Sequence, residues 1–261
     1  MSELVRFETE GHLAWVTLAR PEVMNALSFD TLLALREVTA RLRDDSHVRV
    51  VCFTGDGEKA FCAGADLKER VTFTEERTRA FVALIGDTFA DIAALPQPTV
   101  AALNGVAFGG GLELALACDM RVARDGVKMG LTETSLAIIP GAGGTQRLTA
   151  LVGVARAKEL ILASRRIDAQ EALRIGLVNA VAPADDLLGT VRELVSSIAA
   201  NGPLAVRAAK EAIDLAAGGG TLGQNLLRER ELYLERVLPS SDRLEALAAF
   251  RDKRKPEFQG R

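Results

Sequence analysis

The chain has 261 residues, with 32 Lys and Arg against 35 Asp and Glu, which leaves a formal net charge of −3. A nearly neutral chain is poorly suited to general binding of nucleic acids or membrane surfaces. Hydrophobic residues make up 48% and charged residues 26% of the chain, which excludes disorder as its dominant state. Aromatic residues make up only 5%, so we expect a core of mainly Ala, Leu and Val.

The scarce residue types narrow the chemistry. Cys52, Cys62 and Cys118 have no CxxC spacing and lie in apolar stretches, so we predict small core residues rather than a disulfide framework or a zinc site. His12 and His47 lie in turn-like, polar surroundings and are expected at the surface. A Ser-His-Asp triad, a Cys-His pair and a metal centre are therefore disfavoured, and acid–base chemistry is expected to rest on carboxylates. Because no secretory signal is visible, we expect a cytoplasmic protein.

The first half of the chain predicts strands, turns and helices in alternation. Period-two alternation and continuous apolar runs predict strands over 5–9, 13–17, 48–54, 61–62 and 99–103. Helical spacing predicts helices over 28–43, 74–95 and 112–118. The uncharged stretch 92–112 has the length of a membrane span, but its prolines and glycines favour a turn, a buried strand and a glycine-rich loop.

The second half begins with the same alternation and then becomes helical. Short strands are predicted at 120–123, 128–131 and 177–178, and helices from Thr145 and over 158–163 and 169–175. Beyond residue 185 the pattern is helical, with helices beginning at Pro203 and over 221–238 and 242–252. We therefore predict an α/β core over 1–200 and a helical oligomerisation region over 201–261. The alternative is that these last helices cover their own core.

Three glycine-rich segments could suggest nucleotide binding. However, no GxxxxGK[ST] occurs, and Gly141–Gln146 does not match GxGxxG. Gly109–Gly111 precedes a predicted helix, and Ala65 follows Gly64 in a loop after a strand. Two free N–H groups directed at one point would form an oxyanion hole. The alternative is that the glycines only permit tight packing.

Two glutamates lie near these segments in the sequence. Glu113 lies in an apolar run directly after the triple glycine, and Glu133 lies in a short polar loop. Two carboxylates beside a polarised carbonyl could add or remove water at the neighbouring carbons. A carboxylate on an exposed helix face is the alternative.

Three motifs occur in a characteristic order and spacing: FCAGADLKE at 61–69, NGVAFGGGLE at 104–113 and IPGAGGTQRL at 139–148. Together they resemble the enoyl-CoA hydratase/isomerase (crotonase) superfamily over nearly the whole chain. The resemblance implies a crotonase-like spiral of ββα units with a C-terminal helical trimerisation region. It also implies an acyl-CoA substrate, a homo-trimer or hexamer, and no permanently bound cofactor, with coenzyme A present only as part of the substrate.

The resemblance also assigns roles to residues. The N–H groups of Ala65 and Gly110 would form the oxyanion hole, and Glu113 and Glu133 would hold one water and add it to the double bond in the syn sense. The residues implied in binding coenzyme A or substrate are Ala63, Ala65, Asp66, Leu67, Lys68, and Phe250 and Lys253 toward a neighbouring subunit. Glu22 departs from the pattern, because many relatives have a basic residue there.

Further segments, at 63–70, 111–119, 133–140 and 242–245, resemble the methylglutaconyl-CoA hydratase branch of leucine metabolism. Its substrate carries a distal carboxylate, for which Arg70 and Arg79 are the candidate cations. The alternative is that both are solvated helix charges. A general short-chain enoyl-CoA hydratase is the second functional hypothesis, and an RNA-binding homologue the third. For RNA binding, the helix over 29–43 has arginines but no lysine and is interspersed with acids, so nucleic acid is not the expected partner.

Overall fold

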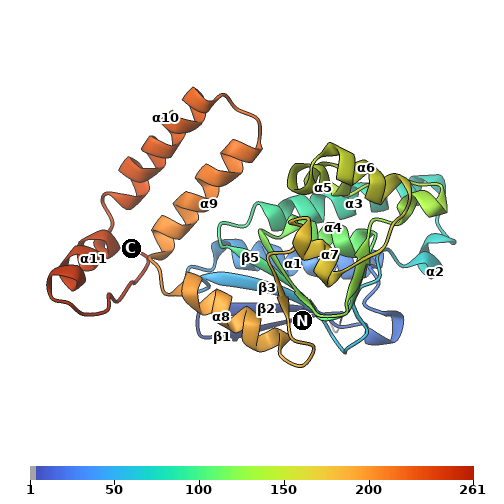
Figure 1. Ribbon diagram of the computed structural model, residues 1–261, viewed down its shortest axis with the longest axis horizontal. Helices are drawn as coiled ribbons and strands as arrows, with labels where there is room; N and C mark the ends of the chain where they lie inside the picture. Colours follow the sequence, from blue (N-terminus) through green and yellow to red (C-terminus); the bar gives the residue numbers. More distant parts are fainter. Residues whose placement is uncertain (1–3) are drawn as a thin grey trace.

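Two β-sheets organise the α/β core (Figure 1) of this computed structural model, which describes residues 4–261. The larger sheet has the strand order β1-β2-β3-β5-β7-β10, in which only β1 is antiparallel to its neighbour. Its strands are β1 (Val5–Glu10), β2 (Leu13–Leu18), β3 (Val50–Gly55), β5 (Thr99–Leu103), β7 (Met120–Arg124) and β10 (Ala180–Ala182). The smaller sheet has the order β4-β6-β8-β9, with strands β4 (Ala60–Cys62), β6 (Val106–Phe108), β8 (Lys128–Gly130) and β9 (Ile167–Asp168).

The chain repeats one path three times. It forms a strand of the large sheet, then a strand of the small sheet, and then a helical segment: β3 and β4 precede α2 (Leu67–Arg70) and α3 (Glu75–Ala93), and β5 and β6 precede α4 (Gly110–Ala117). The third pass, β7 and β8, leads to a 3₁₀ helix at Glu133–Leu136 and then to α5 (Gly144–Val152) and α6 (Val154–Leu162). Because β4, β6 and β8 are neighbours in one parallel ladder, the loops that follow them come together at one edge.

Apolar side chains fill the space on both sides of the large sheet. One cluster joins the two sheets to α1 (Phe29–Asp44), α3 and α4. A second cluster packs Trp15 and other residues of the opposite face under α8 (Leu187–Ala199). Strands β3 and β5 are covered on both faces, which explains why each is a continuous apolar run in the sequence.

Local signals explain where the helices begin. The Ser28 hydroxyl accepts a hydrogen bond from the Thr31 N–H at 3.2 Å, and Thr74 caps α3 in the same way. In the core α7 (Ala169–Arg174) follows Asp168, whose carboxylate accepts from the Glu171 N–H at 2.8 Å. These caps bear out the predicted helix starts at 28 and 74.

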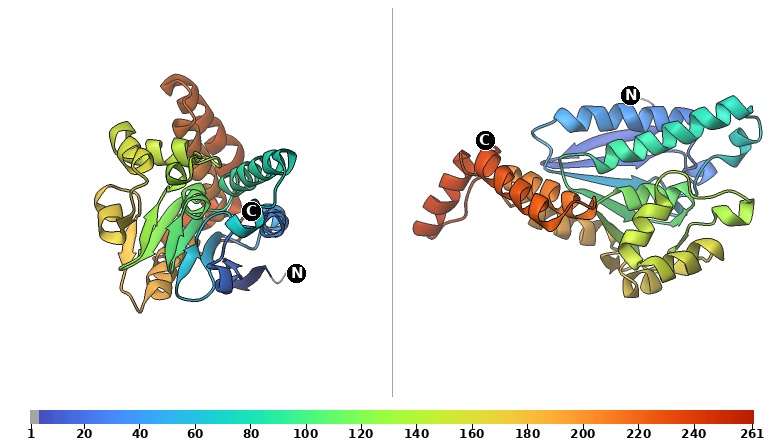
Figure 2. Two further views of the ribbon diagram at one scale, coloured as in Figure 1. Left: turned by 90° about the vertical axis from the view of Figure 1, so that its right-hand side faces the viewer. Right: turned by 90° about the horizontal axis from the view of Figure 1, so that it is seen from above.

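The last 60 residues form an arm of helices. It contains α9 (Pro203–Ala217), α10 (Leu222–Leu232), a π-helical turn at Tyr233–Val237 and α11 (Ser241–Arg251). Figures 1 and 2 show the arm extending away from the sheets, with α9 and α10 side by side. Most of its surface is therefore not used to cover this chain's own core.

Several predicted elements differ from the observed ones. The strand expected at 177–178 lies at 180–182, because Leu177 and Val178 instead close α7 by donating to the Ala172 carbonyl and are buried in the core. The helix expected over 221–238 changes to a π-helical turn at Tyr233. Helix α6 begins before the expected residue 158, and five short elements were not predicted: β6, β9, α2 and the 3₁₀ helices at Pro21–Val23 and Glu133–Leu136. They contain two to four residues each, too few for a periodic signal.

The three cysteines and His47 lie where the sequence predicts, whereas His12 is less exposed than expected. All three cysteines are free and buried. Burial raises the pKa of Cys62 to about 12 and of Cys118 to about 12, so neither is a reactive thiolate. His47 is exposed and His12 half-buried. Within residues 4–261 no helix is long and apolar enough to cross a membrane, and the stretch 92–112 forms the end of α3, then β5, β6 and the start of α4.

Candidate functional site

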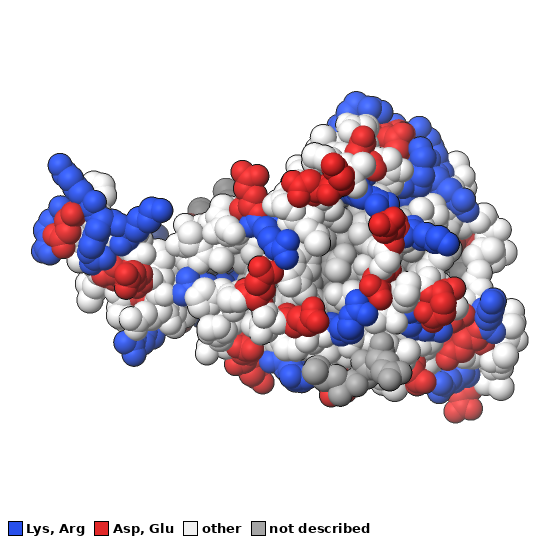
Figure 3. Space-filling view, turned by 90° about the horizontal axis from the view of Figure 1, so that it is seen from below, with Lys and Arg blue, Asp and Glu red and all other residues white. Residues whose placement is uncertain are grey.

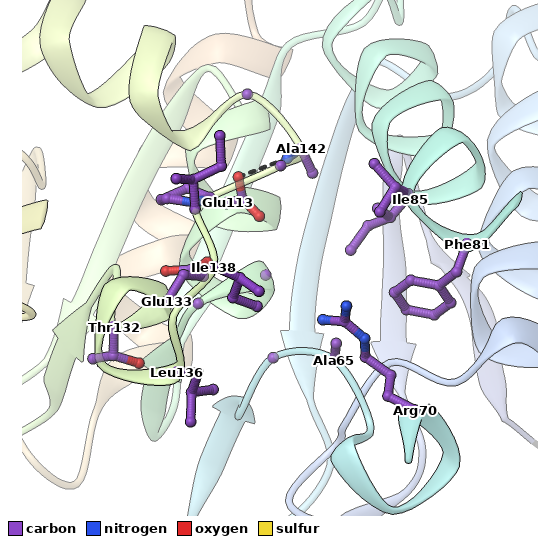
Figure 4. Close-up of a pocket in the computed structure, with 18 of the residues that line it drawn as sticks. Ala65, Arg70, Phe81, Ile85, Glu113, Thr132, Glu133, Leu136, Ile138 and Ala142 are labelled. Carbon is purple, nitrogen blue, oxygen red and sulfur yellow. Dashed lines mark hydrogen bonds between the residues drawn. The ribbon is translucent and has the colours of Figure 1, made fainter. Parts of the chain in front are cut away.

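A pocket of about 830 Å³ opens where the loops after β4, β6 and β8 meet, opposite one side of α3. Figure 4 shows both predicted glutamates on one side and Phe81, Ile85 and Arg70 on the other. The lining is mainly apolar. Its members include Ala63, Ala65, Leu67, Arg70, Thr78, Phe81, Val82, Ile85, Gly110, Glu113, Thr132, Glu133, Leu136, Ile138, Ile139, Ala142 and Gly143. Most of the residues that the sequence singled out thus meet in one cavity, although they come from distant parts of the chain.

The backbone amides of Ala65 and Gly110 approach each other in the lining of this pocket. An ideal Cβ added to Gly110 would lie 3.7 Å from the Ala65 nitrogen, which shows how closely the two segments approach. As the first residue of α4, Gly110 has an N–H group without a partner inside its helix. The neighbouring bridge to Leu27 uses the Gly64 carbonyl and the Asp66 N–H, so the Ala65 N–H is not used in it. Such a pair of free donors can bind a developing oxyanion.

Glycines make this approach feasible. Gly64 has φ +101°, a conformation that residues with a side chain rarely adopt, and a Cβ there would lie 2.8 Å from the Phe108 carbonyl oxygen. The space at Gly111 is still smaller, since a Cβ added there would lie 2.0 Å from the Cys62 carbonyl oxygen. The glycines therefore serve close packing, and that packing is what brings the two amides together. Close packing and the approach of the two amides are thus parts of one arrangement.

Glu113 projects from α4 into the pocket and is only 3% exposed. Its Oε1 atom accepts hydrogen bonds from the Ala142 N–H at 2.8 Å and from the Gly144 N–H at 2.9 Å. Burial raises the pKa of Glu113, while these two N–H groups and the charge of Arg147 oppose the rise. Its second oxygen remains available to a substrate or a water.

Glu133 has a different environment. It begins the 3₁₀ helix and is 8% exposed, and both of its carboxylate oxygens are buried without a hydrogen-bond partner in residues 4–261. The Gly109 N–H donates to the Gly130 carbonyl, and a Cβ on Gly109 would lie 3.2 Å from Glu133 Oε1. Burial, with a further contribution from the charge of Glu113, raises the pKa of Glu133 to about 7. A carboxyl group of this kind is suited to donating a proton near neutral pH.

The two candidate arginines are in different places. Arg70, at the end of α2, lines the pocket and lies 5.7 Å from the Phe81 ring centroid, and Figure 4 shows its guanidinium turned into the cavity. Arg79 does not line the pocket. Its side chain is 78% exposed and pairs with Glu75 one helical turn away at 2.6 Å. Of the two, only Arg70 stays a candidate for contact with an acyl group, and Arg79 is a solvated helix charge.

Only some of the residues implied in coenzyme A binding line the pocket. Ala63, Ala65 and Leu67 line the pocket. Asp66 does not, because its buried carboxylate caps α2 and pairs with Arg20 at 3.0 Å. Lys68 is exposed on α2 outside the pocket lining. The Asp66 side chain therefore supports the loop instead of facing a ligand.

Phe250 and Lys253 lie at the end of the arm. Phe250 is 86% exposed, and Lys253 follows α11 in an exposed basic segment with Arg251, Arg254 and Lys255. Figure 3 shows mostly positive charge with some acidic groups at the end of the arm, and mixed charge over the core on the face drawn. Neither residue lines the pocket of its own chain.

Some residues of the site were not singled out from the sequence as functional. Ala142 and Gly144 hold Glu113, and Ile138 and Leu136 form part of the apolar wall. The sequence signal for Ala142 and Gly144 was the motif at 139–148, and Leu136 and Ile138 lie in the segment 133–140. Among residues 4–261, no group of three or more His, Cys, Asp or Glu side chains is placed to hold a metal ion.

Comparison with known proteins agrees with this geometry. The profile of a family described as enoyl-CoA hydratase/isomerase matches residues 8–261. The Bacillus subtilis protein YngF, named as a candidate enoyl-CoA hydratase/isomerase, is 50% identical over the full length of both chains. A short-chain-enoyl-CoA hydratase of Clostridium acetobutylicum is 42% identical, covering 97% of this chain and 96% of the relative. The crystal structure of an enoyl-CoA hydratase from Bacillus anthracis superposes with a TM-score of 0.96 at 48% identity, covering 99% of this chain and 100% of that one.

Proposed function

We propose that this chain, which belongs to the enoyl-CoA hydratase/isomerase family, adds water reversibly across the double bond of a 2-enoyl-CoA thioester. The observation that carries this proposal is the pair of buried glutamates in one pocket with the Ala65 and Gly110 amides. One carboxylate has two N–H donors, and the other has no partner within residues 4–261. This difference suits one group to act ionised and the other protonated.

The proposed step follows from these environments. The thioester oxygen accepts hydrogen bonds from the Ala65 and Gly110 N–H groups, which stabilise the enolate, each donor contributing on the order of 3–4 kcal/mol. A water held by both glutamates adds its hydroxyl to the β-carbon and gives its proton to ionised Glu113. Protonated Glu133 delivers its proton to the α-carbon. Transfer of the proton from Glu113 to Glu133 restores the enzyme, and dehydration is the reverse sequence.

The first test is Glu133→Gln. A glutamine keeps the size of the side chain but cannot deliver a proton, so turnover should fall by about 10³-fold or more while the fold and coenzyme A binding persist. Hydration is followed by the loss of enoyl-thioester absorbance, and the fold by circular dichroism. Near-normal hydration by this variant would contradict the proposal.

For the substrate, we propose 3-methylglutaconyl-CoA, with a short-chain enoyl-CoA such as crotonyl-CoA as the alternative. The support is Arg70, a cation inside an otherwise mainly apolar pocket, together with the sequence segments at 63–70 and 133–140. A guanidinium is the group best shaped to bind a carboxylate with two hydrogen bonds. Steady-state kinetics with both thioesters would decide, and a strong preference for crotonyl-CoA would reject the methylglutaconyl assignment.

RNA binding receives no support from the first helix. Arg36 and Arg43 both pair with Asp91, and Arg41 lies 5.2 Å from the Phe7 ring centroid. These cations already have partners in the protein, whereas phosphate binding needs a clustered positive face. A salt-titrated gel shift with AU-rich RNA tests this alternative, since binding to RNA would not depend on Glu113 or Glu133.

We also propose that the arm joins copies of this chain into a trimer or a hexamer in the cytoplasm. Its support is the number of large apolar side chains that α10 and α11 expose, among them Leu222, Leu226, Leu227, Leu244, Leu247 and Phe250. Patches of this kind on a folded chain mark interaction surfaces. In such an assembly Phe250 and Lys253 would reach the coenzyme A of a neighbouring subunit.

A further inference from the structure

The segment Ala142–Gly144 is hydrogen-bonded from two sides. On one side, the N–H groups of Ala142 and Gly144 donate to Glu113 Oε1. On the other side, Arg147 Nη1 on α5 donates to the Ala142 carbonyl oxygen at 3.0 Å. The same guanidinium packs on Gly143, where a Cβ would lie 2.3 Å from Nη1. Arg147 thus holds the short loop that holds Glu113.

The charge of Arg147 has no direct partner. No carboxylate within residues 4–261 lies in an ion pair with it at 4.0 Å or less. Glu113 on α4 and Cys118 at the end of α4 interact electrostatically with Arg147, and burial keeps the Cys118 thiol neutral. Arg147 also borders a groove lined from the arm by Arg207, Lys210, Glu211, Asp214 and Arg236. In this groove Lys210 pairs with Asp119, and Glu211 pairs with Arg228 and Arg236. The carboxylate that interacts most strongly with the charge of Arg147 is therefore Glu113.

We propose that Arg147 is a positioning residue for hydration: it fixes the Ala142 carbonyl so that two N–H groups face Glu113, and its charge favours the ionised form of Glu113. The inference rests on the proposed two-glutamate hydration. Arg147 touches neither substrate nor water in this scheme, because it acts through the loop.

The electrostatics agree with the geometry. Burial raises the pKa of Glu113, and Arg147 opposes that rise together with the two N–H groups. The causes that shift the pKa of Glu133 are burial, its own backbone and Glu113, and do not include Arg147. Loss of the Arg147 charge should therefore affect one glutamate and not the other.

The test is the pH profile of kcat for Arg147→Met, which removes both the charge and the hydrogen bond. In the proposed mechanism the acid limb reports protonation of Glu113, and the alkaline limb reports ionisation of Glu133. We expect the acid limb to move up by about half a pH unit or more and the alkaline limb to stay in place. We expect kcat at the optimum to fall about tenfold. We expect KM to change by less than about threefold, because Ala142 and Gly143 contribute only small groups to the pocket lining.

Two further variants separate charge from structure. Arg147→Lys keeps the charge and a donor, so its acid limb should return toward that of the wild type. Arg156→Met is the matched control, because Arg156 is an exposed arginine on α6 that pairs with Glu159 at 2.8 Å and does not reach the loop. Its profile should equal that of the wild type. Thermal melting shows which variants fold, and Arg147→Gln replaces the Met variant if the latter does not.

An acid limb that stays in place in a folded variant lacking the charge overturns the proposal, whether or not kcat falls. The proposal is also overturned if the acid limb moves as far in Arg147→Lys as in Arg147→Met, since the charge of Arg147 would then not cause the shift. The failure of the proposed function would look different, because Glu113→Gln and Glu133→Gln would then retain hydration regardless of the Arg147 result.

Discussion

Glu113 and Glu133 show how strongly the surroundings of a single residue determine its chemistry. Both are buried glutamates in one pocket, yet Glu113 has two N–H donors and Glu133 has none within the described part of the chain. Burial alone would raise the pKa of both. The donors and Arg147 limit the rise at Glu113, whereas the nearby negative charge adds to the rise at Glu133.

The raised pKa of Glu133 predicts a pH-dependent stability. Its pKa is about 7 in the folded chain, against 4.5 for an ordinary glutamate. The folded state therefore binds more protons between these values, and stability falls as pH rises through this window. Glu133→Gln removes this effect. The free energy of unfolding of the variant should exceed that of the wild type by on the order of 2–3 kcal/mol at pH 8, with no such gain at pH 4.

Urea denaturation at several pH values and one protein concentration measures this difference. Glu76→Gln on the exposed part of α3 is the control, and its stability should follow the wild type at every pH. Equal pH dependence in Glu133→Gln and the wild type would show that the buried carboxyl does not carry the effect.

Arg70 predicts substrate selectivity. A hydrogen bond to a charged group contributes about 1.5–3 kcal/mol, so Arg70→Met should lower kcat/KM for 3-methylglutaconyl-CoA by roughly 10- to 100-fold. Crotonyl-CoA has no distal carboxylate, and its kcat/KM should change by less than about threefold. Arg79→Met is the matched control, because Arg79 lies on the exposed side of α3. A uniform loss on both substrates would assign Arg70 a structural role instead.

At the scale of elements, the position of α4 on β4 determines whether the Ala65 and Gly110 amides approach each other. Gly111 contacts the Cys62 carbonyl so closely that no side chain fits between them. The pairing of β4 with β6 brings the loop of Ala65 to the start of α4, where Gly110 lies. The site is therefore a consequence of how one helix packs on one strand.

Gly111→Ala tests this contact. The added methyl group should push α4 away from β4, cost on the order of 3 kcal/mol of folding free energy or more, and lower turnover because the Gly110 N–H moves. Gly86→Ala is the matched change, since a Cβ there in α3 meets nothing within 4 Å and should stabilise the helix by about 0.5–1 kcal/mol. Thermal melting and hydration assays measure both. Equal stability of the two variants would contradict this account of α4.

At the scale of the whole molecule, the core and the arm have different surfaces. The core encloses most of its apolar residues between sheets and helices, although Val71, Ile139 and Leu162 are exposed, and α10 and α11 expose leucines along an extended arm (Figure 2). An arm of this kind buries little surface by itself. A second copy of the chain would supply the missing contacts.

The double variant Leu226→Asp, Leu227→Asp places charge on the exposed face of α10 and should shift the protein to a smaller assembly, seen by light scattering after gel filtration. Leu188→Asp, a similarly exposed leucine on α8 of the core, should leave the mass unchanged. A wild type that is monomeric at micromolar concentration would refute the assembly proposal.

The sequence by itself determined the family and the long elements and indicated the two candidate glutamates, because these depend on local periodicity and on motifs of fixed spacing. Short elements such as β6 and α2 could not be predicted from the sequence, since three or four residues are too few to show a hydrophobic period. Only the tertiary structure decided which side chains meet: Arg70 lies in the pocket but Arg79 does not, and the Asp66 carboxylate turns to Arg20. The reason is physical. The hydrogen-bond partners and burial that divide Glu113 from Glu133 come from segments distant in the chain, and only folding brings these together.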